Sequence, residues 1–358
     1  MIISIFLFLV LFGIVFNIRH WYIPVIVFLV YLTYRSTLIP DYDNYNAMYN
    51  FIANGNQDTN GGWGWYWICY YASKLRLTYS GLRAIIMLVG CIMILLTFRY
   101  FKISNKYSFI WSLFLVYPAL LEIVQIRFFL AESIVFLSFI FLSKDTTNIK
   151  NKIISILLII AASQVHSSMY LFLLFVIFMS YSNVIIKHTN IAIFFTLIVT
   201  FAARGLIAKV ITMFVNDQRQ DRYVTNGQAL GPFGIVATVT TVVVFYFLMK
   251  GIIKRTSVNE VGTRNFALIK LTYILSVFSF ILTPLSTFDP NYFRLQRLMW
   301  LPMFNIAAVL INSNKSLYLM NQGFSPKLIV TVLTIIGNIA FICIFNFNIL
   351  VGIFNGGL

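Results

Sequence analysis

The stretch EIVQIRFFLAESIVFLSFIFLS, residues 122–143, places charged and polar side chains at the start of a strongly apolar run. Arg127 is the side chain best suited to chemistry there, because its planar fork can bind a carboxylate or phosphate through two hydrogen bonds. An unpaired charge at membrane depth costs about 2.5–3.5 kcal/mol and marks a functional site by default. Glu122 and Glu132 each lie about 140° around an ideal helix from Arg127, so a structural ion pair with one of them remains an alternative. Gln125 completes the polar set.

Three further residues match a chemistry of anions and protons. His166, in AASQVHSSMYLF, follows another apolar run. Histidine titrates near neutrality and can act as a general base. Alternatively, it can be a hydrogen-bond donor with a purely structural role. Arg294 and Arg297, in FDPNYFRLQRLMWLP, are three residues apart and share one face at the start of a helix, which is a good seat for an anion. Their alternative role is to extend towards lipid headgroups.

A similar group occurs in NDQRQDRYVTNG, where Arg222 and Tyr223 follow Arg219. Asp217 precedes Arg219, and Asp221 lies between Arg219 and Arg222. A solvated loop with mutual salt bridges is therefore an equal alternative to anion binding.

Asp41 and Asp43, in PDYD, have a spacing that can bridge a divalent cation and a diphosphate. Asp41 is also a natural cap for a helix over residues 42–52. The sequence contains no phosphate-binding glycine loop, HExxH motif or nucleophile elbow. We therefore expect no cofactor and no resident metal.

The elements that must hold these side chains are membrane helices. The chain of 358 residues is 60% hydrophobic and 10% charged, which predicts an all-α polytopic integral membrane protein in one transmembrane domain, residues 1–358. A span needs about 20 apolar residues, and on that length we expect about twelve spans. They are predicted at 2–18, 21–35, 80–101, 107–121, 123–143, 152–165, 167–185, 190–206, 233–252, 265–284, 291–312 and 327–350. The net charge of +16 has no soluble domain to carry it, so we expect no nucleic acid partner.

Two long connections, 36–79 and 206–232, are expected at one face of the membrane. In the first, apolar side chains recur with helical spacing over residues 42–52, and WGWYWICYY is typical of a membrane interface. That aromatic segment is predicted to be interfacial, with a thirteenth span as the alternative.

Lysine and arginine in the short loops identify the cytoplasmic side. On that topology both termini and both long loops face outward, with eleven lysines and four arginines inside but two lysines and nine arginines outside. Because the outer arginines oppose the orientation rule, they indicate an anionic ligand at the outer face.

These motifs, in this order, resemble the EpsG-like branch of the Wzy-type polysaccharide polymerases. The likeness covers roughly residues 30–310 and rests on PDYDNYNAMY, IRFFLAESIVFL, ASQVHSSMYLF, DRYVTN and FRLQRLMWLPMF. Two positions depart from the family pattern. Phe128 stands where glutamine often follows the motif arginine, and GGWGW stands where a glutamate commonly opens the segment after the first outer loop.

The resemblance implies a polymerase that transfers a growing glycan from undecaprenyl diphosphate to a lipid-linked oligosaccharide repeat unit. The reaction would occur at the outer, periplasmic face of a bacterial inner membrane and build O-antigen or capsule. Membrane lipid is an implied partner, and the resemblance allows a chain-length regulator protein as another. The expected diphosphate ligands are Arg127, Arg222, Arg294 and Arg297; the expected base is His166, then Asp41 or Glu122; and Gln125, Asp43 and Tyr223 are expected to orient or assist.

Three other functions fit part of the pattern. A metal-dependent membrane glycosyltransferase that takes its sugar from a lipid phosphate would use Asp41 and Asp43. A transporter of lipid-linked sugar would use the arginines without chemistry, although the sequence shows no internal repeat. An acyltransferase would use His166.

Overall fold

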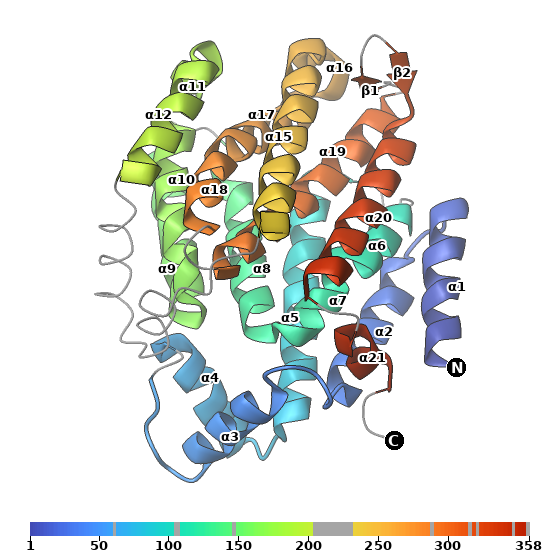
Figure 1. Cartoon of the computed structure of the whole chain (residues 1–358), viewed down its shortest axis with the longest axis vertical. Helices are drawn as coiled ribbons and strands as arrows, with labels where there is room; N and C mark the ends of the chain where they lie inside the picture. Colours follow the sequence, from blue (N-terminus) through green and yellow to red (C-terminus); the bar gives the residue numbers. More distant parts are fainter. Residues whose placement is uncertain are drawn as a thin grey trace. The chain divides into compact units, whose positions relative to one another are not determined.

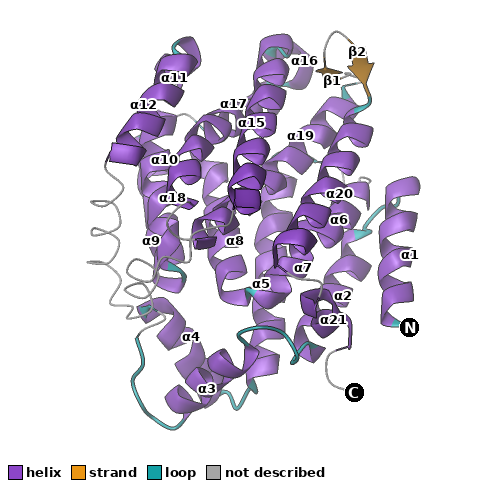
Figure 2. Cartoon of the chain, in the orientation of Figure 1, coloured by secondary structure: helices purple, strands orange, loops and turns teal. Residues whose placement is uncertain are grey.

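The computed structural model of the chain describes residues 1–59, 62–103, 108–144, 148–202, 232–286, 290–313, 317–319, 322–345 and 348–355. These residues are helical almost throughout (Figure 2), which confirms the all-α class. The exception is one antiparallel hairpin in which β1 (Leu317–Leu319) pairs with β2 (Gln322–Phe324). The second predicted loop, 206–232, lies outside the described residues except for residue 232. The predictions for Arg222 and Tyr223 therefore also fall outside the described residues.

Three of the described helices are long and apolar enough to cross a membrane: Tyr79–Tyr100, Gly234–Arg255 and Thr263–Ser286. Shorter apolar helices of 10–17 residues accompany them at Ile2–Val15, Tyr22–Arg35, Ser108–Val124, Ser167–Ser180, Thr189–Ala202 and Pro326–Ile339. The chain is therefore a helical membrane protein, and the number of twelve spans stays a prediction.

The chain divides into two compact units. The first comprises Met1–Leu137, Gln164–His166 and Lys327–Leu358. Its helices (Figure 1) are α1 (Ile2–Val15), α2 (Tyr22–Arg35), α3 (Tyr42–Ala53), α4 (Trp63–Lys74), α5 (Tyr79–Tyr100), α6 (Ser108–Phe114), η1 (Leu115–Ala119), α7 (Leu120–Val124), most of α8 (Ile126–Leu142), nearly all of α20 (Pro326–Phe345) and α21 (Asn348–Asn355).

The second unit comprises Ser138–Ser163 and Ser167–Pro326. It contains most of α9 (Ile149–Val165), then η2 (Ser167–Tyr170), α10 (Leu171–Ser180), α11 (Ser182–Lys187), α12 (Thr189–Ala202), α15 (Pro232–Arg255), α16 (Val258–Val261), α17 (Thr263–Phe278), η3 (Ser279–Ile281), α18 (Leu282–Ser286), η4 (Pro290–Met299), α19 (Trp300–Asn312) and the hairpin.

Two predicted boundaries differ from the structure. A break at residue 122 was expected, but the predicted span 107–121 is already kinked at Tyr117, where φ is −160° and ψ is 130°. The chain is then helical through Val124 and breaks at Gln125, where φ is −112° and ψ is 51°. Glu122 lies in the middle of α7 and is fully buried. The run predicted as one span from residue 291 begins as the 3-10 helix η4 and becomes an α-helix only at Trp300.

Helix α5 is central to the first unit because it packs along α2 and against α8. Gly90 permits the second contact, since a Cβ atom there would overlap the ring of Phe129 on α8. A polar contact joins α6 to the chain after α1, where the Trp21 indole donates to Ser112 Oγ over 3.0 Å. The contact of Gly90 with Phe129 thus holds the first turn of α8 against α5.

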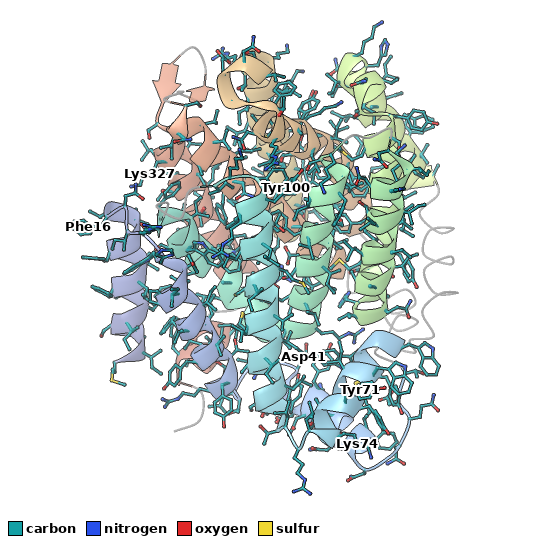
Figure 3. The ribbon with its side chains drawn as sticks, turned by 180° about the vertical axis from the view of Figure 1, so that it is seen from behind. Phe16, Asp41, Tyr71, Lys74, Tyr100 and Lys327 are labelled. Atoms are coloured by element: carbon teal, nitrogen blue, oxygen red, sulfur yellow. The ribbon has the colours of Figure 1, made fainter. Side chains whose placement is uncertain are left out.

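Helices α3 and α4 pack on each other near the Tyr79 end of α5. Each has 12 residues, or about 18 Å at 1.5 Å per residue, which is too short for a hydrocarbon core of about 30 Å. Tyr49 of α3 is buried and donates from its hydroxyl to the Leu77 carbonyl over 2.5 Å. Figure 3 shows Asp41, Tyr71 and Lys74 at this end of the unit and Tyr100 at the other end of α5.

Candidate anion site at a broken helix

The break at Gln125 places Arg127 in the first turn of α8. Its Nε donates a hydrogen bond to the carbonyl oxygen of Val165 over 2.6 Å. Val165 is the last residue of α9, and the last carbonyls of a helix have no amide of their own helix to accept from. Arg127 therefore joins the positive end of one helix to the negative end of another.

This hydrogen bond leaves the fork of Arg127 available. The side chain is half-buried, and within the described part of the chain Val165 is the only hydrogen-bond partner of its guanidinium. It forms no ion pair with Glu122 or Glu132 there, so the structural ion-pair alternative does not hold for the described residues. Because Nε is fixed, the plane of the fork is fixed, and its two Nη groups can bind an anion in a bidentate way.

His166 lies at the same contact between the start of α8 and the end of α9. It follows Val165 in the chain, and its ring packs edge-on against Phe128 with centroids 5.2 Å apart and planes at 83°. Two consecutive residues of α8 thus contact two consecutive residues at the end of α9. The structure brings Arg127 and His166 together, and it gives Phe128 a contact that a glutamine would not make.

The first turn of α4 approaches the same segment. Gly62, with φ +89°, and Gly64 both lie against Gln164, where a Cβ on Gly64 would come within 3.0 Å of its backbone. Further along α4, burial raises the pKa of the Cys69 thiol to about 12, and the positive charge of Arg127 opposes that rise. Gly62 and Gly64 therefore permit a close contact between the start of α4 and the end of α9.

Asp41 and Asp43 are exposed at the start of α3. Asp41 occupies the N-cap position with φ +66°, and its side chain makes no capping hydrogen bond, so the capping role expected from sequence is not fulfilled by the carboxylate. Asp43 lies in the first turn. Among the described residues no group of three or more His, Cys, Asp or Glu side chains could hold a metal ion.

A buried arginine that the sequence analysis did not single out lies near the break. Arg83 of α5 is only 1% exposed. Its Nη1 donates to the Ser36 carbonyl over 2.5 Å and its Nη2 to the Ile123 carbonyl over 2.9 Å. The sequence signal was present, because an arginine inside a 22-residue apolar helix is as unusual as Arg127.

In the second unit, η4 carries Arg294 and Arg297. A 3-10 helix has three residues per turn, so these side chains share one face. Arg297 is 2% exposed and donates from Nε to the Arg294 carbonyl over 3.3 Å. Between them Gln296 donates to the Thr238 carbonyl of α15 over 3.3 Å. Burial of Arg297 is inconsistent with an extension towards lipid headgroups.

A model of the EpsG family matches residues 18–353 of the chain, a range that includes each candidate residue named above. No curated protein and no solved structure matches it.

Proposed function

The chain belongs to the EpsG family, and from that premise we propose that this membrane protein is a polysaccharide polymerase. It transfers a growing glycan from undecaprenyl diphosphate to a lipid-linked oligosaccharide repeat unit. The membrane is the bacterial inner membrane, and the site faces the periplasm.

The observation that supports this proposal best is the geometry of Arg127. A lipid diphosphate is an anion held at the membrane surface, and the fork of Arg127 is oriented by Val165 at the start of a helix, where partial positive charge also attracts anions. No carboxylate among the described residues neutralises that arginine.

The chemistry of the transfer requires such donors. A hydroxyl oxygen of the acceptor sugar attacks the anomeric carbon, and the bond from that carbon to the diphosphate oxygen breaks. Undecaprenyl diphosphate leaves with the electron pair, so negative charge grows on its phosphate. A preorganised donor aimed at that charge lowers the barrier by about 2.7–4 kcal/mol.

His166 is the proposed base for the acceptor hydroxyl, and its ring contact with Phe128, the residue after Arg127, supports that proposal. General-base assistance is worth about 10²–10⁴-fold in rate. Asp41 and Glu122 remain second choices. The phosphate-binding roles of Arg222, Arg294 and Arg297 and the assisting roles of Gln125, Asp43 and Tyr223 remain predictions.

One assay separates the candidate functions. Purified protein in lipid nanodiscs is incubated with a single synthetic undecaprenyl-diphosphate-linked repeat unit, with and without EDTA. A polymerase gives a ladder of products that EDTA does not abolish. Single-sugar products that disappear in EDTA would instead identify a metal-dependent glycosyltransferase. A transporter would leave the substrate unchanged in nanodiscs and would move it across the membrane when the protein is reconstituted in proteoliposomes.

A further inference from the structure

Arg83 is a buried cation with an unusual set of partners. Within the described residues no carboxylate pairs with it; its guanidinium meets two backbone carbonyls and the rings of Tyr42 and Tyr79, at 5.2 and 6.0 Å from the ring centroids. Removing a charge from water costs several kcal/mol. Carbonyl dipoles and aromatic faces recover part of that cost, so the position calls for a role that an apolar side chain cannot perform.

The two carbonyls identify that role. In a continuous helix through α7 and α8, the carbonyl of Ile123 would accept the amide of Arg127, four residues later. The chain breaks at Gln125 instead, and Arg83 Nη2 donates to Ile123. Arg83 thus supplies a donor where the broken helix lacks the regular one.

The second carbonyl ties this break to another helix. Ser36 follows the last residue of α2, and its carbonyl accepts from Arg83 Nη1. The Ser36 hydroxyl lies 2.5 Å from the Leu32 carbonyl of α2 and 3.2 Å from the Ile353 carbonyl of α21. A fork with two donors can hold both carbonyls at once, whereas a lysine ammonium is a single point on a flexible stem. The ring of Tyr42, at the start of α3, also contacts the Arg83 guanidinium, so Arg83 contacts α3 as well.

We infer that Arg83 is the positioning residue for Arg127: by satisfying the carbonyl released at the break, it holds the end of α7 in an ordered conformation and Arg127 at the first turn of α8. Both Nη groups of Arg83 donate to backbone carbonyls, so we assign it no contact with substrate. The inference rests on the proposed function only for its kinetic consequence, since the geometry of the break can be measured without substrate.

The first test is hydrogen exchange in the full-length protein in detergent. Arg83→Met removes both donors and keeps the length of the side chain, and we expect amides of residues 124–129 to exchange at least about tenfold faster. Arg99→Met is the matched control, because Arg99 is an exposed arginine of the same helix. Unchanged exchange at 124–129 in folded Arg83→Met would overturn the inference.

The second test is kinetic. A displacement of about 1 Å at a reacting group can cost about 10²-fold in rate, so Arg83→Met should lower kcat about 10- to 100-fold per folded molecule, with KM changed less than about threefold. A residue that only supports folding would lower the yield of folded protein and leave kcat unchanged. If the wild-type protein forms no ladder, the proposed function fails while the exchange test still decides the role of Arg83.

Arg83→Lys covers the case in which the methionine variant does not fold. It keeps the charge but cannot hold both carbonyls, so we expect faster exchange at 124–129 and a reduced kcat. Wild-type values of both quantities in Arg83→Lys would contradict the inference.

Discussion

Arg127 Nε donates to the Val165 carbonyl oxygen over 2.6 Å, so an arginine in the first turn of α8 caps the end of α9. The partner is a backbone group and not a carboxylate. That difference decides what the arginine can do, because a carboxylate would occupy the fork and cancel its charge, whereas a carbonyl on Nε fixes the plane and leaves the outer edge for a ligand.

Arg127→Lys keeps the positive charge and removes the fork. We expect the rate of polymer formation to fall about 10²–10³-fold, close to the effect of Arg127→Ala, because one ammonium cannot place two donors on a phosphate. The measurement is the rate of ladder formation from a lipid-linked repeat unit, with Arg99→Lys as the control. Wild-type chain lengths from Arg127→Ala would refute the role assigned to this residue.

His166→Gln tests the proposed base. Glutamine keeps a hydrogen-bonding side chain but cannot accept a proton at neutral pH, so we expect polymerisation to slow about 10²–10⁴-fold. His188→Gln is the control, since His188 is exposed at the end of α11. Equal rates in the two variants would transfer the role of base to Asp41 or Glu122.

Asp41→Gly separates a functional carboxylate from a structural one. Asp41 has φ +66°, a conformation that glycine adopts without the steric cost of a side chain, and its carboxylate makes no capping hydrogen bond. We expect the thermal midpoint of unfolding to stay the same or rise, and polymerisation to fall only if the Asp41 carboxylate takes part in the reaction. Full activity in a stable Asp41→Gly protein would remove Asp41 from the site.

Gly64→Ala tests the contact between α4 and the segment that carries His166. The new Cβ would lie 2.9 Å from the Cβ of Gln164, and overpacking of this kind costs about 1–3 kcal/mol. We expect lower thermal stability and a lower polymerisation rate. Gly251→Ala is the control, because a Cβ there meets nothing within 4 Å and alanine favours a helix; equal effects of the two changes would contradict the contact.

The Cys69 thiol makes stability depend on alkaline pH. Burial raises its folded-state pKa from 9.0 to about 12. Below pH 9 the thiol is protonated in both states, but between pH 9 and 12 only the unfolded state loses its proton, so folding stability falls by about 1.4 kcal/mol per pH unit in that range. We expect Cys69→Ala to flatten this slope in denaturant titrations from pH 8 to 11, and the folded thiol to react slowly with maleimide. An unchanged slope would mean that Cys69 is not buried.

The sequence by itself determined the class of the protein. Long apolar runs, few charges and tryptophan-rich connections identify membrane helices because each signal is local in the chain. The sequence also selected Arg127 and His166, since a charge inside an apolar run is visible without a structure. It could not locate the break within residues 120–127, because a helix end is decided by the packing of its neighbours as much as by its own residues.

Only the tertiary structure decided which groups the two arginines bind. Arg127 binds a carbonyl of Val165 and Arg83 binds carbonyls of Ser36 and Ile123. Every residue has a carbonyl, so no residue type reveals which one a distant arginine will reach. The sequence also gives no sign that Gly64 contacts Gln164, because a glycine shows only that a side chain is absent. Residues far apart in the chain become one site because helix ends leave backbone groups unpaired and buried arginines satisfy them.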